Sequence, residues 1–347
     1  MNHALATERG LTLVEILVSL VIGLFLMGGI FRVYLANKEA YRLNDAMARL
    51  QENGRFAVEF LARDLRLAGY NGCGGRMRDV TSTLNPTTDP RFDFEDHIQG
   101  YEADGSGWSP SFDGQVIDAP RAGSDILLVR GAFSDPVRIT GQPNNTADCA
   151  LGNAASHTAD LKVNDSRGLT AGDIVLATDC SHATIFQITN VNLNGNLVHN
   201  TGNVVAPGNR TKDLGACYAG QGQLMKMETR IFYVRDNDRG QPALYRIRGT
   251  GAPEELVEGV EQIQVRYGVD TDNDRSANKY ATADQVTAAG EWTRVVSLRV
   301  EMLLHSVEDQ ITTAPQPYTF DGTTSTPDDR RLRRVFTTTV ALRNLTP

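Results

Sequence analysis

The apolar residues of this chain are concentrated in one stretch near its N-terminus, from Leu11 to Phe31. The stretch reads LTLVEILVSLVIGLFLMGGIF and carries a single charge, on Glu15. A helix of this length spans ~32 Å, which matches the ~30 Å hydrocarbon core of a bilayer. No small-residue cleavage site follows it, and the helical pattern continues. The pattern therefore predicts a retained transmembrane helix over 11–31 rather than an ordinary secretory signal.

Beyond Phe31 the apolar positions narrow to one stripe, and no proline interrupts the chain before residue 68. The spacing of the stripe follows a helical period, which predicts an amphipathic helix over 32–68 with one buried and one solvated face. A buried face needs a surface to pack against, and a β-sheet from the rest of the chain is the natural candidate. The stripe comprises Leu43, Met47, Leu50, Ala57, Leu61 and Leu65.

From Asp125 onward, short apolar or alternating runs are separated by clusters of Gly, Asn and Asp, which is typical of β-strands. Two segments, 263–269 and 296–304, alternate clearly, as expected of a sheet with one face packed on a helix. Residues 335–343 predict the strand that closes this sheet. The predicted fold class is therefore α+β: a long N-terminal helix, half transmembrane and half amphipathic, packed on an antiparallel β-sheet with a β-rich insertion.

The same pattern suggests a division of the chain. Residues 82–120 are rich in Pro, Gly, Asp and Ser and predict a long irregular loop. The expected segments are a leader (1–10), the transmembrane half of the helix (11–31), its amphipathic half (32–68), an irregular loop region (69–120), a β-rich insertion (121–220) and a C-terminal antiparallel sheet (221–347).

Glu15 is the informative residue of the apolar stretch. An ionised carboxylate at the centre of a bilayer costs about 2.5–3.5 kcal/mol, so such a residue is usually functional and needs a partner. If the chain is cut after Gly10, the new amino terminus on Leu11 lies one helical turn before Glu15. The ammonium and the carboxylate could then pair within one chain or between neighbouring chains. The alternative is that Glu15 simply lies at the level of the lipid headgroups.

The residues GLTLVE at 10–15 resemble the class III signal of type IV prepilins and type II secretion pseudopilins. This resemblance implies cleavage between Gly10 and Leu11 by a prepilin peptidase, N-methylation of Leu11, and a role for Glu15 in the register of assembled subunits. The first mature residue in those families is usually Phe, whereas here it is Leu11.

Three further segments, 52–75, 255–274 and 330–344, resemble the PilW family of type IV pilus minor pilins. The resemblance implies a subunit that helps to initiate pilus assembly, forms part of the tip complex and supports twitching motility and adhesion. The implied partners are other minor pilins, the major pilin, the pilus tip adhesin, the inner-membrane assembly platform and the prepilin peptidase. The implied location is the inner membrane, with a periplasmic C-terminal domain, before assembly and the tip of the fimbrium afterwards.

Two other functions remain open at this stage. A J-type minor pseudopilin of a type II secretion system would share the leader and the helix. An adhesive or DNA-uptake module at the tip would use the middle of the chain. A net charge of −8 and a pI near 5.3 argue against nucleic acid as a partner.

Four cysteines, Cys73, Cys149, Cys180 and Cys217, all follow the apolar stretch. Their intervals are too long for a zinc site, and an even number in an exported domain favours two disulfides. Four cysteines allow three pairings, among which the sequence does not choose. We expect Cys73–Cys149 and Cys180–Cys217.

An acidic run, DTDND, follows one of the alternating segments and is followed by Asn278. The alternating carboxylates of Asp270, Asp272 and Asp274 could converge on Ca²⁺, with Asn278 as a further ligand. The sixth and twelfth positions lack the Gly and Glu of an EF-hand, so a complete EF-hand is excluded. The two interpretations are a partial calcium loop and a solvated acidic turn.

No pattern indicates catalysis or a cofactor other than this calcium ion. The six histidines are scattered, and the chain has no HExxH, GxSxG or P-loop motif. Cys180 and His182 lie close in sequence, but a disulfide cysteine beside a surface histidine explains them. We therefore expect a structural protein and not an enzyme.

Overall fold

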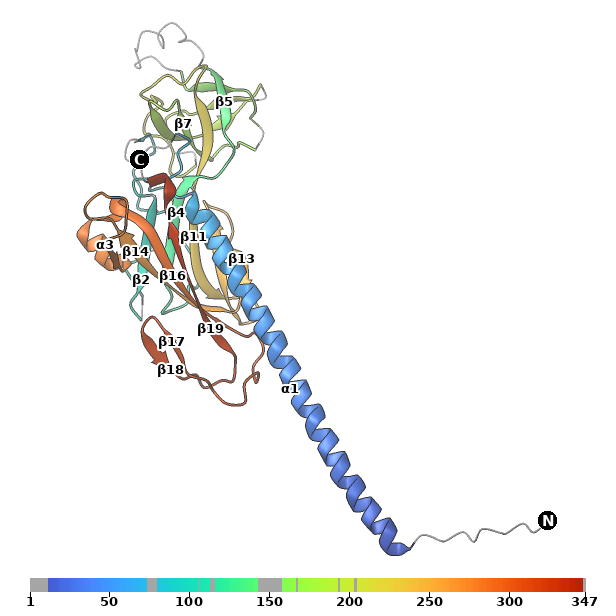
Figure 1. The fold of residues 1–347 in the computed structure, drawn as a ribbon. Coiled ribbons are helices and arrows are strands. Elements are labelled where there is room, and N and C mark those ends of the chain that lie inside the picture. The colour runs from blue at the N-terminus through green and yellow to red at the C-terminus, as the bar shows by residue number, and fades with distance from the viewer. Residues whose placement is uncertain are drawn as a thin grey trace, which may run out of the picture.

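A single helix, α1 (Leu13–Arg66), extends far beyond the globular part of the molecule (Figure 1). The structure is a computed structural model, and it describes residues 12–73, 80–105, 107–112, 116–142, 158–166, 168–192, 194–202 and 205–345. The helix has 54 residues and is therefore ~81 Å long. One unbroken helix was predicted over both halves, and the described residues confirm it.

The end of α1 is fixed by local backbone geometry. Leu67 is the C-cap, and Gly69 has a φ of 70°, a left-handed conformation that costs glycine little. The amide of Gly69 then donates to the carbonyl of Arg130, so the chain leaves the helix and joins a strand of the sheet at once.

Two antiparallel sheets form the central part of the molecule. In the first sheet, β11 pairs with β4 and β12, while β2 and β13 lie outside them. In the second, the order is β15-β14-β16-β19. The strands of the first sheet are β2 (Ile98–Ala103), β4 (Ile126–Ala132), β11 (Gln223–Asp236), β12 (Pro242–Arg248) and β13 (Glu254–Glu258), with the short β3 (Trp108–Ser109) beside β2. Those of the second are β14 (Val260–Val269), β15 (Lys279–Ala281), β16 (Val295–His305) and β19 (Arg333–Ala341).

The main hydrophobic core joins these two sheets to the C-terminal half of α1. One continuous cluster of buried side chains contains Leu61 and Leu65 of the helix, Phe232 of the first sheet and Val265 and Val300 of the second. The helix contacts β13 and β19, which are the edge strands of the two sheets. The predicted packing of the apolar stripe on an antiparallel sheet is confirmed, and β19 closes the sheet as expected.

A smaller β module continues from the first sheet at the end opposite the N-terminus of α1 (Figure 1). The first residues of β11 pair with β5 and β7, and its later residues pair with β4 and β12, so this strand belongs to both parts. The module has its own core, which includes Phe186 and Tyr218. Its other strands are β1 (Thr81–Ser82), β5 (Val137–Gly141), β6 (Asp160–Val163), β7 (Ile174–Thr178), β8 (Ala183–Gln187), β9 (Asn190–Val191) and β10 (Asn196–Val198).

Short elements decorate the second sheet. A helix, α3, leaves β15 and packs near β2, and a small hairpin of β17 and β18 approaches β19. These elements are α3 (Ala283–Ala289), η3 (Trp292–Arg294), β17 (Tyr318–Phe320), β18 (Thr323–Ser325) and η4 (Arg343–Leu345).

Two segments differ from the pattern-based division. The range predicted as an irregular loop contains β2, which pairs with β4 in the central sheet. Its sequence, IQGYEA, offers only two large apolar residues, and Gly100 is needed because a side chain there would clash with the Tyr267 ring. The range predicted as an insertion contains β4, which belongs to the central sheet and not to the smaller module.

The disulfide pairing also differs from expectation. Cys73 bonds to Cys180, with Cα atoms 5.1 Å apart, so neither expected bridge is formed. The pairing follows from the docking of the β7–β8 turn beside the chain that leaves α1, which no local pattern encodes. Cys217 is also disulfide-bonded, and Cys149 lies outside the described residues.

Candidate functional site

The first turn of α1 is closed by a reciprocal pair of side chains. The Thr12 hydroxyl accepts from the Glu15 amide at 3.3 Å, and the Glu15 carboxylate accepts from the Thr12 amide at 2.9 Å. This capping box satisfies helix N–H groups that would otherwise lack partners. Glu15 is therefore held at the very start of the helix, whereas Gly10 and Leu11 lie outside the described residues.

The apolar half of α1 has no protein partner in the described structure. Its large side chains, from Leu13 to Phe31, are exposed, and no heavy atom outside the helix would lie within 4 Å of a Cβ at Gly23, Gly28 or Gly29. Among the described residues, α1 is the helix with the length and composition to cross a membrane. This half is therefore available to lipid and to the helices of other subunits.

The C-terminal half of α1 is fixed to the sheets by close packing and by a buried ion pair. At Gly54 an added Cβ would overlap the Phe336 ring of β19, so only glycine permits this approach. Asp64 has no exposed surface, and its two carboxylate oxygens accept from Arg230 at 2.5 Å and from Arg246 at 3.0 Å. The apolar N-terminal half of the helix therefore extends in a fixed direction relative to the sheets.

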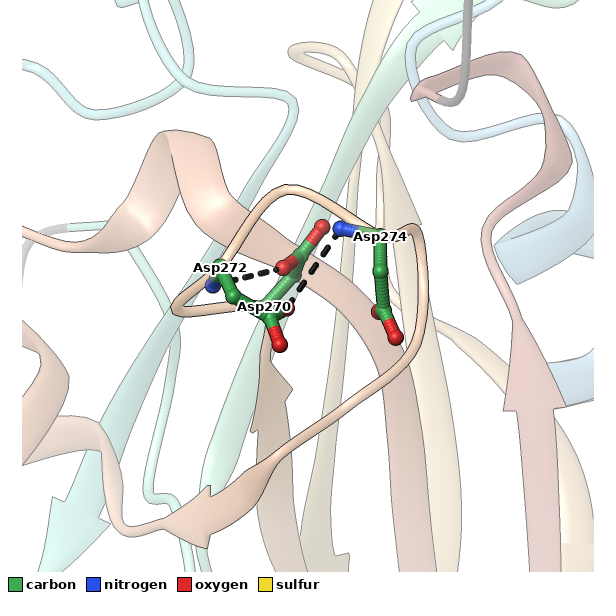
Figure 2. Close-up of side chains that lie close together, drawn as sticks. All are labelled: Asp270, Asp272 and Asp274. Atoms are coloured by element: carbon green, nitrogen blue, oxygen red, sulfur yellow. Dashed lines mark hydrogen bonds between the residues drawn. The ribbon is translucent and has the colours of Figure 1, made fainter.

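The loop between β14 and β15 brings the three predicted aspartates together (Figure 2). Oxygen atoms of Asp270, Asp272 and Asp274 all lie within 4.8 Å of one another. Asp270 is buried, and the other two are exposed. Three carboxylates at this separation are hard ligands of the kind that Ca²⁺ takes.

Hydrogen bonds within the loop hold this arrangement. Burial alone would raise the pKa of Asp270, but the amides of Arg275, Asn273 and Asp272 donate to its carboxylate and keep its pKa below the ordinary value. Asn278, the fourth predicted ligand, turns its amide oxygen to the Thr271 amide at 2.6 Å. The oxygens of Asp270 and the Asn278 oxygen thus already accept from backbone amides, and the Asn278 side chain also donates to the Asp272 carboxylate at 3.3 Å. Calcium binding stays a prediction.

No catalytic constellation occurs in the part of the chain that the structure describes. The Cys180 thiol is consumed in a disulfide, and His182 contacts Asp179 on an exposed turn. The candidate functional features are the two halves of α1 and the acidic loop.

Comparison with known proteins identifies both ends of the chain. Residues 5–31 match the family model described as Prokaryotic N-terminal methylation motif, which covers the capped and apolar half of α1. Residues 231–344 match the model described as Type IV Pilus-assembly protein W, or PilW. This C-terminal third is similar to the PilW family. It contains the last part of β11 and every strand of the second sheet.

The chain is thus similar to the pilus-assembly family over its C-terminal third and to the methylation motif, which is the class III signal, at its N-terminus. The apolar helix and that signal are consistent with anchoring in the inner membrane before assembly. No curated protein matches the chain. A solved structure, a type IV-like pilin TTHA1219 from Thermus thermophilus, is 11% identical, with a TM-score of 0.34; the alignment covers 86% of this chain and 99% of that one.

Two groups of this protein were missed by sequence reasoning. Thr12 completes the cap on Glu15, and the S/T-x-x-E pattern at 12–15 was a usable signal. Asp64 lies among the apolar positions Leu61, Leu65 and Ala68, and a carboxylate in a buried stripe indicates a buried cationic partner.

Proposed function

We propose that this protein is a minor pilin that helps to initiate type IV pilus assembly and becomes part of the pilus tip complex. The observation that carries the proposal is α1 itself, because one continuous helix has a fully exposed apolar half and a half that is fixed to the sheets. The apolar half of such a helix can move from a bilayer into a helical bundle while the other half stays packed on the globular domain.

Glu15 supplies the specific contact in this proposal. In the free subunit its carboxylate caps its own helix through Thr12. After cleavage behind Gly10, the amino terminus of a neighbouring subunit offers a full positive charge in place of that cap. A charge-assisted contact is about twice as strong as a neutral hydrogen bond, and in an apolar surrounding the attraction is greater still. The partners are other minor pilins, the major pilin, the tip adhesin and the inner-membrane platform, and the peptidase processes the leader.

Replacing Glu15 with glutamine tests the proposal. Glutamine also serves in a capping box, so Glu15→Gln keeps the helix start and removes only the charge. We expect normal membrane levels and processing of the variant but a large loss of surface pili. The matched control is Glu39→Gln, an exposed residue of the same helix, which should leave pili unchanged. Normal piliation with Glu15→Gln would overturn the role of the carboxylate.

A further inference from the structure

β19 forms one border of the second sheet. Its nine residues pair with β16 in a single register without a bulge. In an antiparallel pair, alternate residues direct both backbone groups to the partner strand, and the residues between them direct theirs away from it. The amide of Leu342, just beyond β19, donates to the Val296 carbonyl of β16, so the even-numbered residues face β16. The odd-numbered residues of β19 therefore direct their N–H and C=O groups away from the sheet.

These outward backbone groups form a free edge. They belong to Val335, Thr337, Thr339 and Ala341, and no hydrogen bond joins them to any other residue that the structure describes. The side chains of Thr337, Thr339 and Ala341 are exposed, whereas Phe336 and Val340 turn to the opposite face, toward the core and α1. A row of unpaired donors and acceptors of this kind is a template for a further strand.

The border strand of the first sheet, β13, is protected in ways that β19 is not. β13 has five residues, a register shift against β12, and glutamates at 254, 255 and 258. The Asn53 side chain of α1 also donates to the Glu258 carbonyl. β19 is longer, has no shift, and contains no proline, lysine or acidic residue. Proteins that act as separate subunits blunt their sheet edges, so this contrast indicates that another chain covers β19.

We propose that β19 receives an extended segment of a different protein, which adds to the second sheet as a further strand. Backbone hydrogen bonds supply the attraction in this mode of recognition, and the alternating side chains supply the specificity. The inference rests on the proposed function, which places α1 in a membrane shared with other subunits.

The side chains along β19 define the chemistry of this segment. Thr337 and Thr339 are small and exposed, which leaves room for β-branched or aromatic residues opposite them. Arg334, at the start of the strand, is exposed and lies over the Phe336 ring, and no carboxylate pairs with it among the described residues. The segment is therefore β-prone, free of proline at the paired positions, and acidic at the end that meets Arg334.

A second copy of this chain does not fit the edge. β19 runs in the same direction as α1, because Phe336 lies at Gly54 and Asn344 donates to the Arg66 carbonyl further along both elements (Figure 1). Antiparallel pairing of two β19 strands would point the two α1 helices in opposite directions, so both could not enter one membrane. Parallel pairing would need an offset of one residue, because the outward groups of both strands are odd-numbered, and this offset breaks the symmetry of a closed dimer.

Hydrogen exchange of the purified full-length protein in detergent tests whether the edge is free. The amides of Phe336, Thr338 and Val340 are bonded to β16, whereas those of Thr337 and Thr339 face outward. We expect the outward amides to exchange about tenfold faster or more. Equally slow exchange at both sets would show that the chain covers its own edge, and this result would overturn the proposal.

Photocrosslinking in intact cells of the natural host tests the occupant. The photoreactive residue p-benzoylphenylalanine replaces Thr337 or Thr339, one at a time, in the full chain. We expect both positions to form adducts with the same segment of a different protein. Moving the probe by two residues along β19 should move the adduct by two residues along that segment, as in a paired strand. Adducts with a second copy, adducts without this ladder, or an absence of adducts would each overturn the proposal.

Variants at Thr337 test whether backbone pairing carries the contact, with the probe at position 339. Thr337→Pro removes an outward N–H, a change that an edge strand tolerates, and should reduce the adduct roughly fivefold or more. The matched control Thr337→Val keeps the N–H and the shape and should leave the adduct unchanged. Arg334→Glu leaves the backbone intact, so it gives a second test if the proline variant does not fold, and it should also reduce the adduct. Unchanged adducts with Arg334→Glu and with a folded Thr337→Pro would overturn the proposal.

The outcomes separate this inference from the proposed function. Loss of pili on deletion of the gene, without a ladder of adducts from β19, would overturn the added strand alone. A ladder of adducts in a host that keeps normal pili after the deletion would overturn the proposed function alone.

Discussion

Asp125 lies at the start of β4, where it ties the two central sheets together. Its carboxylate accepts from the Ala103 amide of the first sheet at 2.9 Å and from the Val265 amide of the second at 2.8 Å. Burial, and then the nearby charge of Glu102, raise the pKa of Asp125 to about 7. These two effects outweigh the amide donors and the more distant Arg266, which act in the opposite direction.

This raised pKa predicts a contribution to stability that changes with pH. Between about pH 4 and pH 7 the folded state holds a proton on Asp125 that the unfolded state has lost. The free energy of unfolding should therefore fall as pH rises through this window, by up to about 1.4 kcal/mol per pH unit from this group, and level off above it. Denaturation at a series of pH values is the measurement.

The comparison that isolates Asp125 is the variant Asp125→Asn, which does not titrate. From pH 4 to pH 7 the natural protein should steadily lose unfolding free energy relative to this variant. A difference that stays constant across the window would contradict the raised pKa.

The two most informative carboxylates, Glu15 and Asp125, differ in how easily they are recognised from the sequence. Glu15 stands out because it is the single charge in an apolar stretch, and the structure places it at the helix cap. Asp125 has no local signal, because its partners belong to strands β2 and β14, which are distant in the chain. A functional residue can be recognised from the sequence when its type is unusual among its neighbours in the chain, as a charge is in an apolar stretch.

At the scale of elements, the contact between α1 and the first sheet depends on Asp64. Replacing Asp64 with alanine would leave Arg230 and Arg246 buried without their shared carboxylate. Loss of one partner of a buried ion pair typically costs about 3–5 kcal/mol. We expect the lower end of that range, because Arg230 also contacts Glu228 and Phe133 and Arg246 also contacts Glu254.

Chemical denaturation of the full chain in detergent measures this cost. The control is Asp45→Ala, an exposed carboxylate of the same helix paired with Arg49, which should change stability by less than about 0.5 kcal/mol. Equal effects of the two substitutions would show that the buried network does not fix the helix.

The acidic loop yields a prediction about calcium. Three carboxylates within 4.8 Å repel one another, and a divalent cation relieves that repulsion. Calorimetric titration should give heat of binding at or below millimolar Ca²⁺, and Asp272→Asn with Asp274→Asn should remove it. Asn278→Ala should weaken binding less than these two changes, because Asn278 orients Asp272 and Thr271 through its side-chain amide while the carboxylates remain. No heat at millimolar Ca²⁺ would leave the loop as a solvated acidic turn.

Strands with a strong alternating pattern could be predicted from the sequence. A strand whose residues make room for side chains of another segment could not. β14 and β16 alternate because one face of each packs into the core between the two sheets and α1, and both appear where they were expected. β2 has few apolar residues because Gly100 makes room for Tyr267, so its sequence resembles a loop. The loop aspartates were found from spacing alone, while the orientation of Asn278 depends on Thr271.

At the scale of the molecule, one helix connects three environments. Its apolar half is exposed, one face of its C-terminal half packs against the edges of the two sheets, and the chain beyond it is bonded to the smaller module through Cys73 and Cys180. This arrangement fixes the globular domain relative to the helix. The disulfide pairing required knowledge of how the smaller module docks, so the sequence left it open.

The central claim is that this protein initiates pilus assembly, and deletion of its gene tests that claim most directly. Surface pili and twitching are measured in the deletion strain and after complementation with the natural chain, and type II secretion is measured alongside them. The account predicts loss of pili and twitching, restoration by complementation, and normal secretion. Normal piliation in the deletion strain would contradict it, and a defect in secretion alone would indicate a pseudopilin.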